Sequence, residues 1–184
     1  MPAFPFHYCR FSPTMITNEQ LREAFLTPQM KYYFDKKLSP LPSAEVDARI
    51  EELLKYLNMS VHSPGDIPFS TEIDDVWHYW ILQTEQYAQL CDRLHGRTFL
   101  HHTSNDYVEY IDPDAKHRRI ELRRGVAILA SYVFNYGPFS IDKVRYWPLA
   151  GRLMELLHWD LDRLNRWLLV PFATAADPVQ GVNP

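Results

Sequence analysis

Residues 72–102 read EIDDVWHYWILQTEQYAQLCDRLHGRTFLHH, and the apolar positions in this stretch decide the fold class. These positions recur every three or four residues, which is the period of an α-helix and not of a strand. Acidic residues occupy the first turn, where the helix dipole favours them, and Gly96 is a typical helix end. The stretch therefore predicts one long helix, capped by Thr71 and ended by Gly96. Its apolar stripe comprises Ile73, Val76, Trp77, Trp80, Ile81, Thr84, Tyr87, Ala88 and Cys91.

Helical periodicity and capping signals also occur on both sides of this stretch. Thr17 and Gln20 have the spacing of a capping box, and Ser43 is a suitable N-cap for a helix through residues 44–57. Further helices are predicted at 28–38, 112–136, 140–147, 148–158 and 160–168, whereas the connector after residue 98 could contain a short strand or hairpin. We expect an all-α fold, a compact single-domain bundle of six to eight helices over residues 17–172 with little or no sheet. An extended N-terminal arm (1–16) precedes it and a flexible tail (173–184) follows.

The composition excludes several classes of protein. The chain has 184 residues, of which 46% are hydrophobic, so it is too apolar for a disordered protein. The net charge of −4 creates no field that would recruit nucleic acid, and no apolar run approaches the length of a membrane span. Cys9 and Cys91 form neither a disulfide framework nor a thiolate metal site, and the N-terminus lacks the pattern of a signal peptide. We expect a cytoplasmic protein with no nucleic-acid or membrane partner.

Histidine and acidic residues gather around the start of the predicted central helix. Asp74 lies four residues before His78 on the same helix face, and His101 and His102 follow in the connector. Imidazole and carboxylate groups together suit a transition metal such as Zn or Fe, so His78, His101 and His102 are candidate metal ligands. The alternative is structural: Asp74 and His78 form a hydrogen bond within the helix, and the paired histidines orient a loop.

The order of residues in 72–102 resembles the core motif of the glycine-rich domain-containing protein-like family. The shared pattern is acid-x-x-W-H, then T-x-x-Y, Cys, Gly and His-His, so Asp74, Trp77, His78 and Tyr87 are the motif residues that we expect to form a site. One departure is Trp80, which stands where the family often has a second histidine. The resemblance implies a compact helical domain, and short bacterial relatives imply a role beside peptide-modifying enzymes in ribosomal-peptide biosynthesis.

Two functions of different classes follow from these features. The first is a non-catalytic accessory or binding protein that holds a peptide or a partner enzyme, with an acidic segment contacting Arg118, Arg119, Arg123 and Arg124. It is favoured by the lack of a complete catalytic signature. Independently of either function, Trp77 and Tyr87 are predicted to belong to the core. The second is a metal-dependent enzyme or metal-binding protein centred on His78, His101 and His102.

Overall fold

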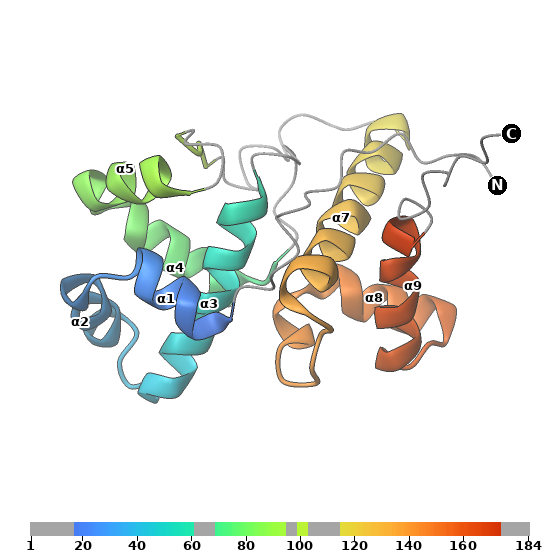
Figure 1. The fold of residues 1–184 in the computed structure, drawn as a ribbon, viewed down its shortest axis with the longest axis horizontal. Coiled ribbons are helices and arrows are strands. Elements are labelled where there is room, and N and C mark those ends of the chain that lie inside the picture. Colours follow the sequence, from blue (N-terminus) through green and yellow to red (C-terminus); the bar gives the residue numbers. More distant parts are fainter. Residues whose placement is uncertain (1–16, 61–68, 95–98, 103–114, 174–184) are drawn as a thin grey trace, which may run out of the picture.

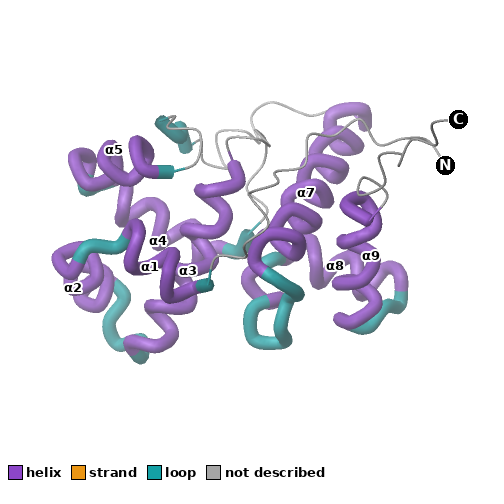
Figure 2. The backbone as a smooth tube through the Cα atoms, in the orientation of Figure 1, coloured by secondary structure: helices purple, strands orange, loops and turns teal. Residues whose placement is uncertain are grey.

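Eight α-helices and one 3-10 helix make up the part of the chain that the computed structural model describes, residues 17–60, 69–94, 99–102 and 115–173 (Figure 1). No strand occurs among these residues, and the all-α prediction is confirmed (Figure 2). The predicted arm at 1–16 and residues 174–184 of the predicted tail lie outside the described residues, whereas Ala173, the first residue of that tail, is the last residue of the final helix. The elements are α1 (Asn18–Phe25), α2 (Pro28–Lys37), α3 (Ser43–Ser60), α4 (Thr71–Ile81), α5 (Thr84–Arg93), α7 (Ala115–Tyr136), η1 (Val144–Tyr146), α8 (Pro148–Leu157) and α9 (Leu161–Ala173).

The capping box predicted from the sequence begins helix α1. The backbone amide of Gln20 donates to Thr17 Oγ1 over 3.2 Å, and the Thr17 amide donates to Gln20 Oε1 over 2.8 Å. Each side chain thus satisfies an amide that would otherwise have no partner at the helix start. The start of helix α2 is also stabilised locally. Pro28 occupies its first turn, and the Thr27 side chain accepts a hydrogen bond from the Met30 amide.

Helix α3 is the central element of the fold. Every residue from Ile50 to Met59 is buried, so this segment is enclosed on all sides. Helices α1, α2 and α4 pack against α3 on one side and α7 packs against it on the other, where α8 and α9 complete the C-terminal group (Figure 1). Helix α3 therefore joins two groups of helices.

A hydrogen-bonded polar cluster lies in the contact between α3 and the C-terminal group. Lys55 Nζ donates to Glu52 Oε1 over 2.7 Å and to the Tyr132 hydroxyl over 2.9 Å. The Tyr132 hydroxyl also donates to Glu52 Oε1, and Trp147 Nε1 donates to Glu52 Oε2 over 2.8 Å. Both oxygens of the buried Glu52 carboxylate are thus paired, which offsets the cost of removing this charge from water.

The prediction of a single helix over residues 71–96 is wrong, because the chain turns between α4 and α5. Helix α4 ends at Ile81, Gln83 leaves the helical conformation with φ −95° and ψ 70°, and α5 begins at Thr84. The apolar stripe continues across the break because both helices face the same core. In a continuous helix, Trp77 and Tyr87 would be about 15 Å apart along the axis, whereas here their polar atoms are 3.0 Å apart.

The remaining differences from the predicted elements are small. Ser70, not Thr71, occupies the N-cap position of α4. The helix predicted at 140–147 is reduced to a single 3-10 turn, since Pro148 disfavours helical geometry at Trp147, which has φ −122° and ψ 78°. Helix α9 continues past the predicted end at Leu168 to Ala173. Among the described residues, no helix combines the length and the hydropathy needed to cross a membrane.

Candidate functional site

Helix α4 carries an acid in its first turn and a histidine in its last turn on the same face. Asp74 and His78 are one turn apart, and Asp74 Oδ2 lies 3.4 Å from His78 Nδ1. Nearly half of the His78 side chain is exposed, and Asp74 is partly buried. This pairing was predicted from the i, i+4 spacing of the two residues.

His102 reaches the same acid from a different part of the chain. Its Nε2 atom lies 2.8 Å from Asp74 Oδ1, and its side chain is only 6% exposed. The ring packs edge-on against Trp77 at a centroid distance of 4.5 Å and tilts against the ring of His78 at 4.4 Å. The carboxylate of Asp74 therefore lies between two imidazoles, one exposed and one buried.

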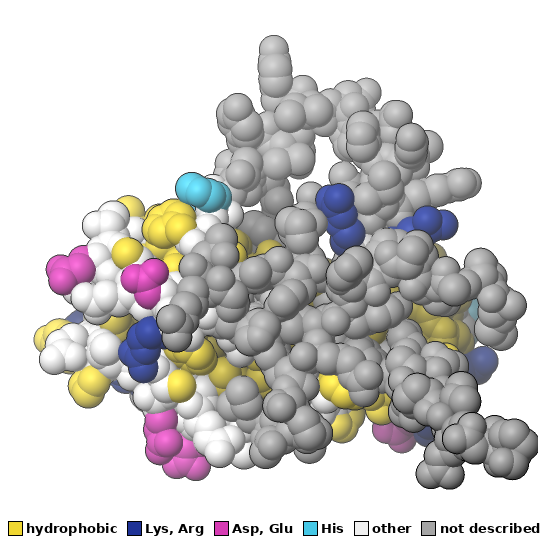
Figure 3. Space-filling model, turned by 45° about the horizontal axis from the view of Figure 1, so that its top comes forward, with side chains coloured by type: hydrophobic (Ala, Val, Ile, Leu, Met, Phe, Trp, Pro, Cys, Tyr) yellow, Lys and Arg dark blue, Asp and Glu magenta, His cyan; other side chains and the backbone are white. Residues whose placement is uncertain are grey.

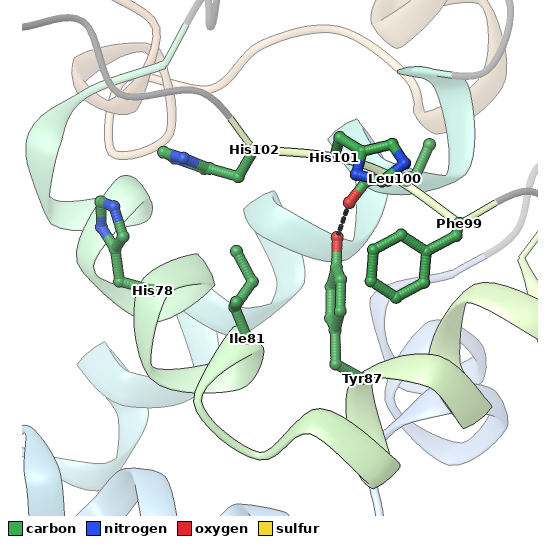
Figure 4. Close-up of a pocket in the computed structure, with 7 residues that line it drawn as sticks. All are labelled: His78, Ile81, Tyr87, Phe99, Leu100, His101 and His102. Carbon is green, nitrogen blue, oxygen red and sulfur yellow. Dashed lines mark hydrogen bonds between the residues drawn. The ribbon is translucent and has the colours of Figure 1, made fainter. Parts of the chain in front are cut away.

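Tyr87 fixes the segment that carries His102. Its hydroxyl accepts a hydrogen bond from Trp77 Nε1 and donates one to the carbonyl oxygen of Leu100 over 2.6 Å (Figure 4). Burial raises the pKa of this hydroxyl well above its usual value. The turn between α4 and α5 makes this contact possible, and the contact in turn holds residues 99–102 against both helices.

A pocket of about 460 Å³ opens beside the two histidines. Ile81 points into it from the end of α4, and the Tyr87 side chain lines it from α5. The 99–102 segment forms the opposite wall (Figure 4). On the molecular surface, a histidine side chain lies next to hydrophobic side chains at the α5 end of the molecule (Figure 3). The pocket is lined by His78, Ile81, Tyr87, Phe99, Leu100, His101 and His102.

Asp74, His78 and His102 together have the chemistry of a metal centre. Each offers one ligand atom, and these three atoms all lie within 4.8 Å of one another. Two imidazoles and one carboxylate form a ligand set used for non-haem Fe(II) and for catalytic Zn²⁺, with further positions left for water or substrate. We call these three residues the Asp-His-His cluster.

A protein-family model described as UCP032817-like matches residues 17–125, more than half of the chain. The chain belongs to the UCP032817-like family. No curated protein and no solved structure matches it. Every residue of the Asp-His-His cluster, and every residue that lines the pocket, lies inside the segment that the UCP032817-like model covers. The resemblance to the glycine-rich domain-containing protein-like family stays a prediction.

The structure brings together most of the predicted site residues. Trp77 and Tyr87 are buried as predicted, with 3% and 1% of their surface exposed. His78 and His102 meet as the metal hypothesis requires, but His101 does not join them. The ring of His101 packs against Phe99 instead and its side chain is exposed, because neighbouring residues in an extended segment point in opposite directions. Asp74, which was predicted from the sequence as a motif residue, offers the third suitable atom in place of His101.

The pocket-lining residues Ile81, Phe99 and Leu100 were not predicted from the sequence. Ile81 was assigned to the core stripe, and a connector of irregular structure carries no periodic signal that would show which residues face a cavity. The sequence signal for Phe99 is its place two residues before the paired histidines in FLHH.

The predicted arginine surface is described only in part. Arg123 and Arg124 are exposed on α7, whereas the side chains of Arg118 and Arg119 lie outside the described residues. Helix α7 is described from Ala115, so the predicted helix start at Asp112 also lies outside them.

Proposed function

We propose that this protein binds a divalent transition metal ion through Asp74, His78 and His102. The observation that carries the proposal is the convergence of three ligand atoms, from residues up to 28 positions apart, beside an open pocket. Zn²⁺ and Fe²⁺ suit this ligand set best.

The surroundings of the cluster also support a metal centre. His102 is held in place by the ring of Trp77 and, through Leu100, by the hydroxyl of Tyr87. Fixed orientation of a ligating imidazole by neighbouring groups is a common property of metal sites. His78 is half exposed at the edge of the pocket, so an ion bound there would be accessible to a small molecule in the pocket.

Titration of the chelator-treated protein with Co²⁺ tests this proposal. Co²⁺ bound by imidazole and carboxylate ligands absorbs visible light, so one equivalent should give saturating absorption bands that Zn²⁺ abolishes by competition. Asp74→Asn and His102→Gln should weaken Co²⁺ binding at least about 10-fold, the usual scale for disturbing a metal site. The matched controls are Asp75→Asn and His101→Gln, which change exposed neighbours outside the Asp-His-His cluster.

Two results would contradict the proposal. One is the absence of Co²⁺ absorption in a folded protein, and the other is equal Co²⁺ affinity in Asp74→Asn and Asp75→Asn. Either would leave the cluster as a hydrogen-bonded structural contact, in which Asp74 does no more than hold the two imidazoles.

The exposure of Arg123 and Arg124 favours a second proposal, the accessory function in which α7 contacts an acidic peptide or a partner enzyme. Arginine pairs with carboxylates through two parallel hydrogen bonds, which suits it to such a contact. Pull-down of neighbouring gene products with wild type and an Arg123→Glu, Arg124→Glu variant tests it. Loss of a partner without loss of stability supports the proposal, and equal recovery by two equally stable proteins contradicts it.

A further inference from the structure

The pocket beside the Asp-His-His cluster has two chemically different ends. At one end are the two cluster histidines, at the other, aromatic end are Phe99, Tyr87 and His101, and Ile81 lies between the two ends (Figure 4). A binding pocket that is lined by apolar and aromatic side chains with a few polar groups fixes the orientation of a ligand as well as its position.

The aromatic end consists of three side-chain rings. Phe99 meets the ring of Tyr87 edge-on at 5.3 Å and that of His101 at 5.1 Å. Tyr87 is almost fully buried, yet half of the Phe99 side chain remains exposed. A fourth ring, that of a ligand, can pack against the exposed surface of Phe99 in the same edge-to-face or offset manner and would remove apolar area from water.

The other end carries a positive charge when a divalent ion is bound. Two neutral imidazoles and one carboxylate leave a net charge of +1 on the centre, and three protein ligands leave coordination positions open. Neither lysine nor arginine is among the described residues that line the pocket, so the metal ion is the positive group that a ligand meets there. This favours an anionic oxygen donor.

From these two ends we infer that the pocket binds a small aromatic carboxylate, its carboxylate on the metal ion and its ring against Phe99. The inference rests on the proposed metal binding and adds the class of ligand. The pocket volume of about 460 Å³ falls within the range of about 300–1,000 Å³ that is usual for small-molecule sites.

Three related compounds separate the contributions of ring and charge. 3-Phenylpropanoate has both, butanoate has the carboxylate without the ring, and 3-phenylpropan-1-ol has the ring without the charge. Each is titrated into the Co²⁺-loaded full-length protein, after saturation with Co²⁺ has been shown, and the visible spectrum reports binding to the ion. We expect 3-phenylpropanoate to shift the Co²⁺ bands and to bind about 10-fold more tightly than either other compound.

Two variants locate the ring. Phe99→Ala should weaken 3-phenylpropanoate about 10-fold while leaving Co²⁺ affinity and butanoate binding unchanged. Leu82→Ala is the matched control, because Leu82 is an exposed apolar residue next to Ile81 that does not line the pocket. Equal effects of the two substitutions would overturn the placement of the ring.

The failure of this inference is distinguishable from the failure of metal binding. If Co²⁺ binds and 3-phenylpropanoate leaves its spectrum unchanged, or if butanoate binds equally tightly, the ligand class is wrong and the metal centre stands. Equal affinity of 3-phenylpropanoate for the metal-free protein, measured by calorimetry, overturns the role of the ion as its anchor. If Co²⁺ does not bind at all, both proposals fall together.

Discussion

Replacing Tyr87 by phenylalanine isolates the hydroxyl that ties α4, α5 and the 99–102 segment together. The substitution removes one oxygen atom and leaves the ring in its core position. Trp77 Nε1 then loses its acceptor at 3.0 Å, and the carbonyl oxygen of Leu100 loses its donor at 2.6 Å. Neither the turn between the helices nor the aromatic contact with Phe99 is changed directly.

The magnitude of the effect follows from the burial of these groups. Trp77 is 3% exposed, so water cannot replace the lost acceptor, and a buried donor without a partner costs about 1–3 kcal/mol. Leu100 is only partly buried, and water can replace the hydroxyl there at little cost. We therefore expect Tyr87→Phe to lower the free energy of unfolding by about 2 kcal/mol. Co²⁺ affinity should fall as well, because Leu100 is two residues from His102.

Urea unfolding followed by tryptophan fluorescence measures the change. Tyr32→Phe is the matched control, since Tyr32 is 65% exposed and the loss of its hydroxyl should change stability by less than about 0.5 kcal/mol. In a double-mutant cycle with Trp77→Phe, the two effects should be less than additive, because the second substitution removes the donor left without a partner. Equal urea midpoints for wild type and Tyr87→Phe, or strict additivity in the cycle, would refute the reasoning.

Three further predictions concern the core and the surface. Lys55→Met should lower the free energy of unfolding by about 3–5 kcal/mol, because it leaves the buried Glu52 carboxylate without its counter-ion while only the neutral donors Tyr132 and Trp147 remain, and adding Glu52→Gln should recover part of this loss in urea unfolding. In a Cys9→Ser variant, the buried Cys91 thiol, whose pKa is raised mainly by burial, should react with a thiol reagent only after denaturation, and fast labelling of the native protein would contradict its placement. Burial alone would raise the pKa of Glu45, but hydrogen bonds from Arg49 and Tyr146 and the charge of Arg145 lower it below the usual 4.5. Its contribution to stability is therefore present above pH 4.5 and lost as the pH falls through the lowered value, and thermal melts of Glu45→Gln should lack this part of the acid destabilisation.

The helices could be predicted from the sequence because their signals are local. Capping residues such as Thr17 and Gln20 act within one turn, and apolar spacing reports which face of a helix is buried. The break after Ile81 could not be predicted in this way, since the apolar stripe runs across it without interruption. What stabilises the break is a contact between Trp77 and Tyr87 that exists only once the chain has turned.

For the candidate site too, the local part could be predicted from the sequence and the part that depends on tertiary contacts could not. The spacing of Asp74 and His78 places both on one helix face, so their pairing follows from helix geometry. Which member of the pair His101–His102 joins them depends on the direction in which an irregular segment crosses α4. That direction is set by the hydrogen bond from Tyr87 to Leu100, which no pattern in the sequence indicates.

The segment matched by the UCP032817-like model ends at residue 125, but the packing of the protein does not divide there. Residue 125 lies in the middle of α7, and a side chain on Gly125 would meet Leu149 Cδ2 of α8 at 2.5 Å, so the two helices approach closely at this point. The buried charges of Glu52 and Lys55 lie inside the matched segment, whereas Tyr132 and Trp147, which donate to Glu52, lie beyond it. Removing residues 126–173 would expose the face of α3 that packs on α7 and would leave the Glu52 carboxylate without two of its donors. The helices that follow the matched segment therefore belong to the same hydrophobic core as Trp77 beside the Asp-His-His cluster, although none of their described side chains lines the pocket.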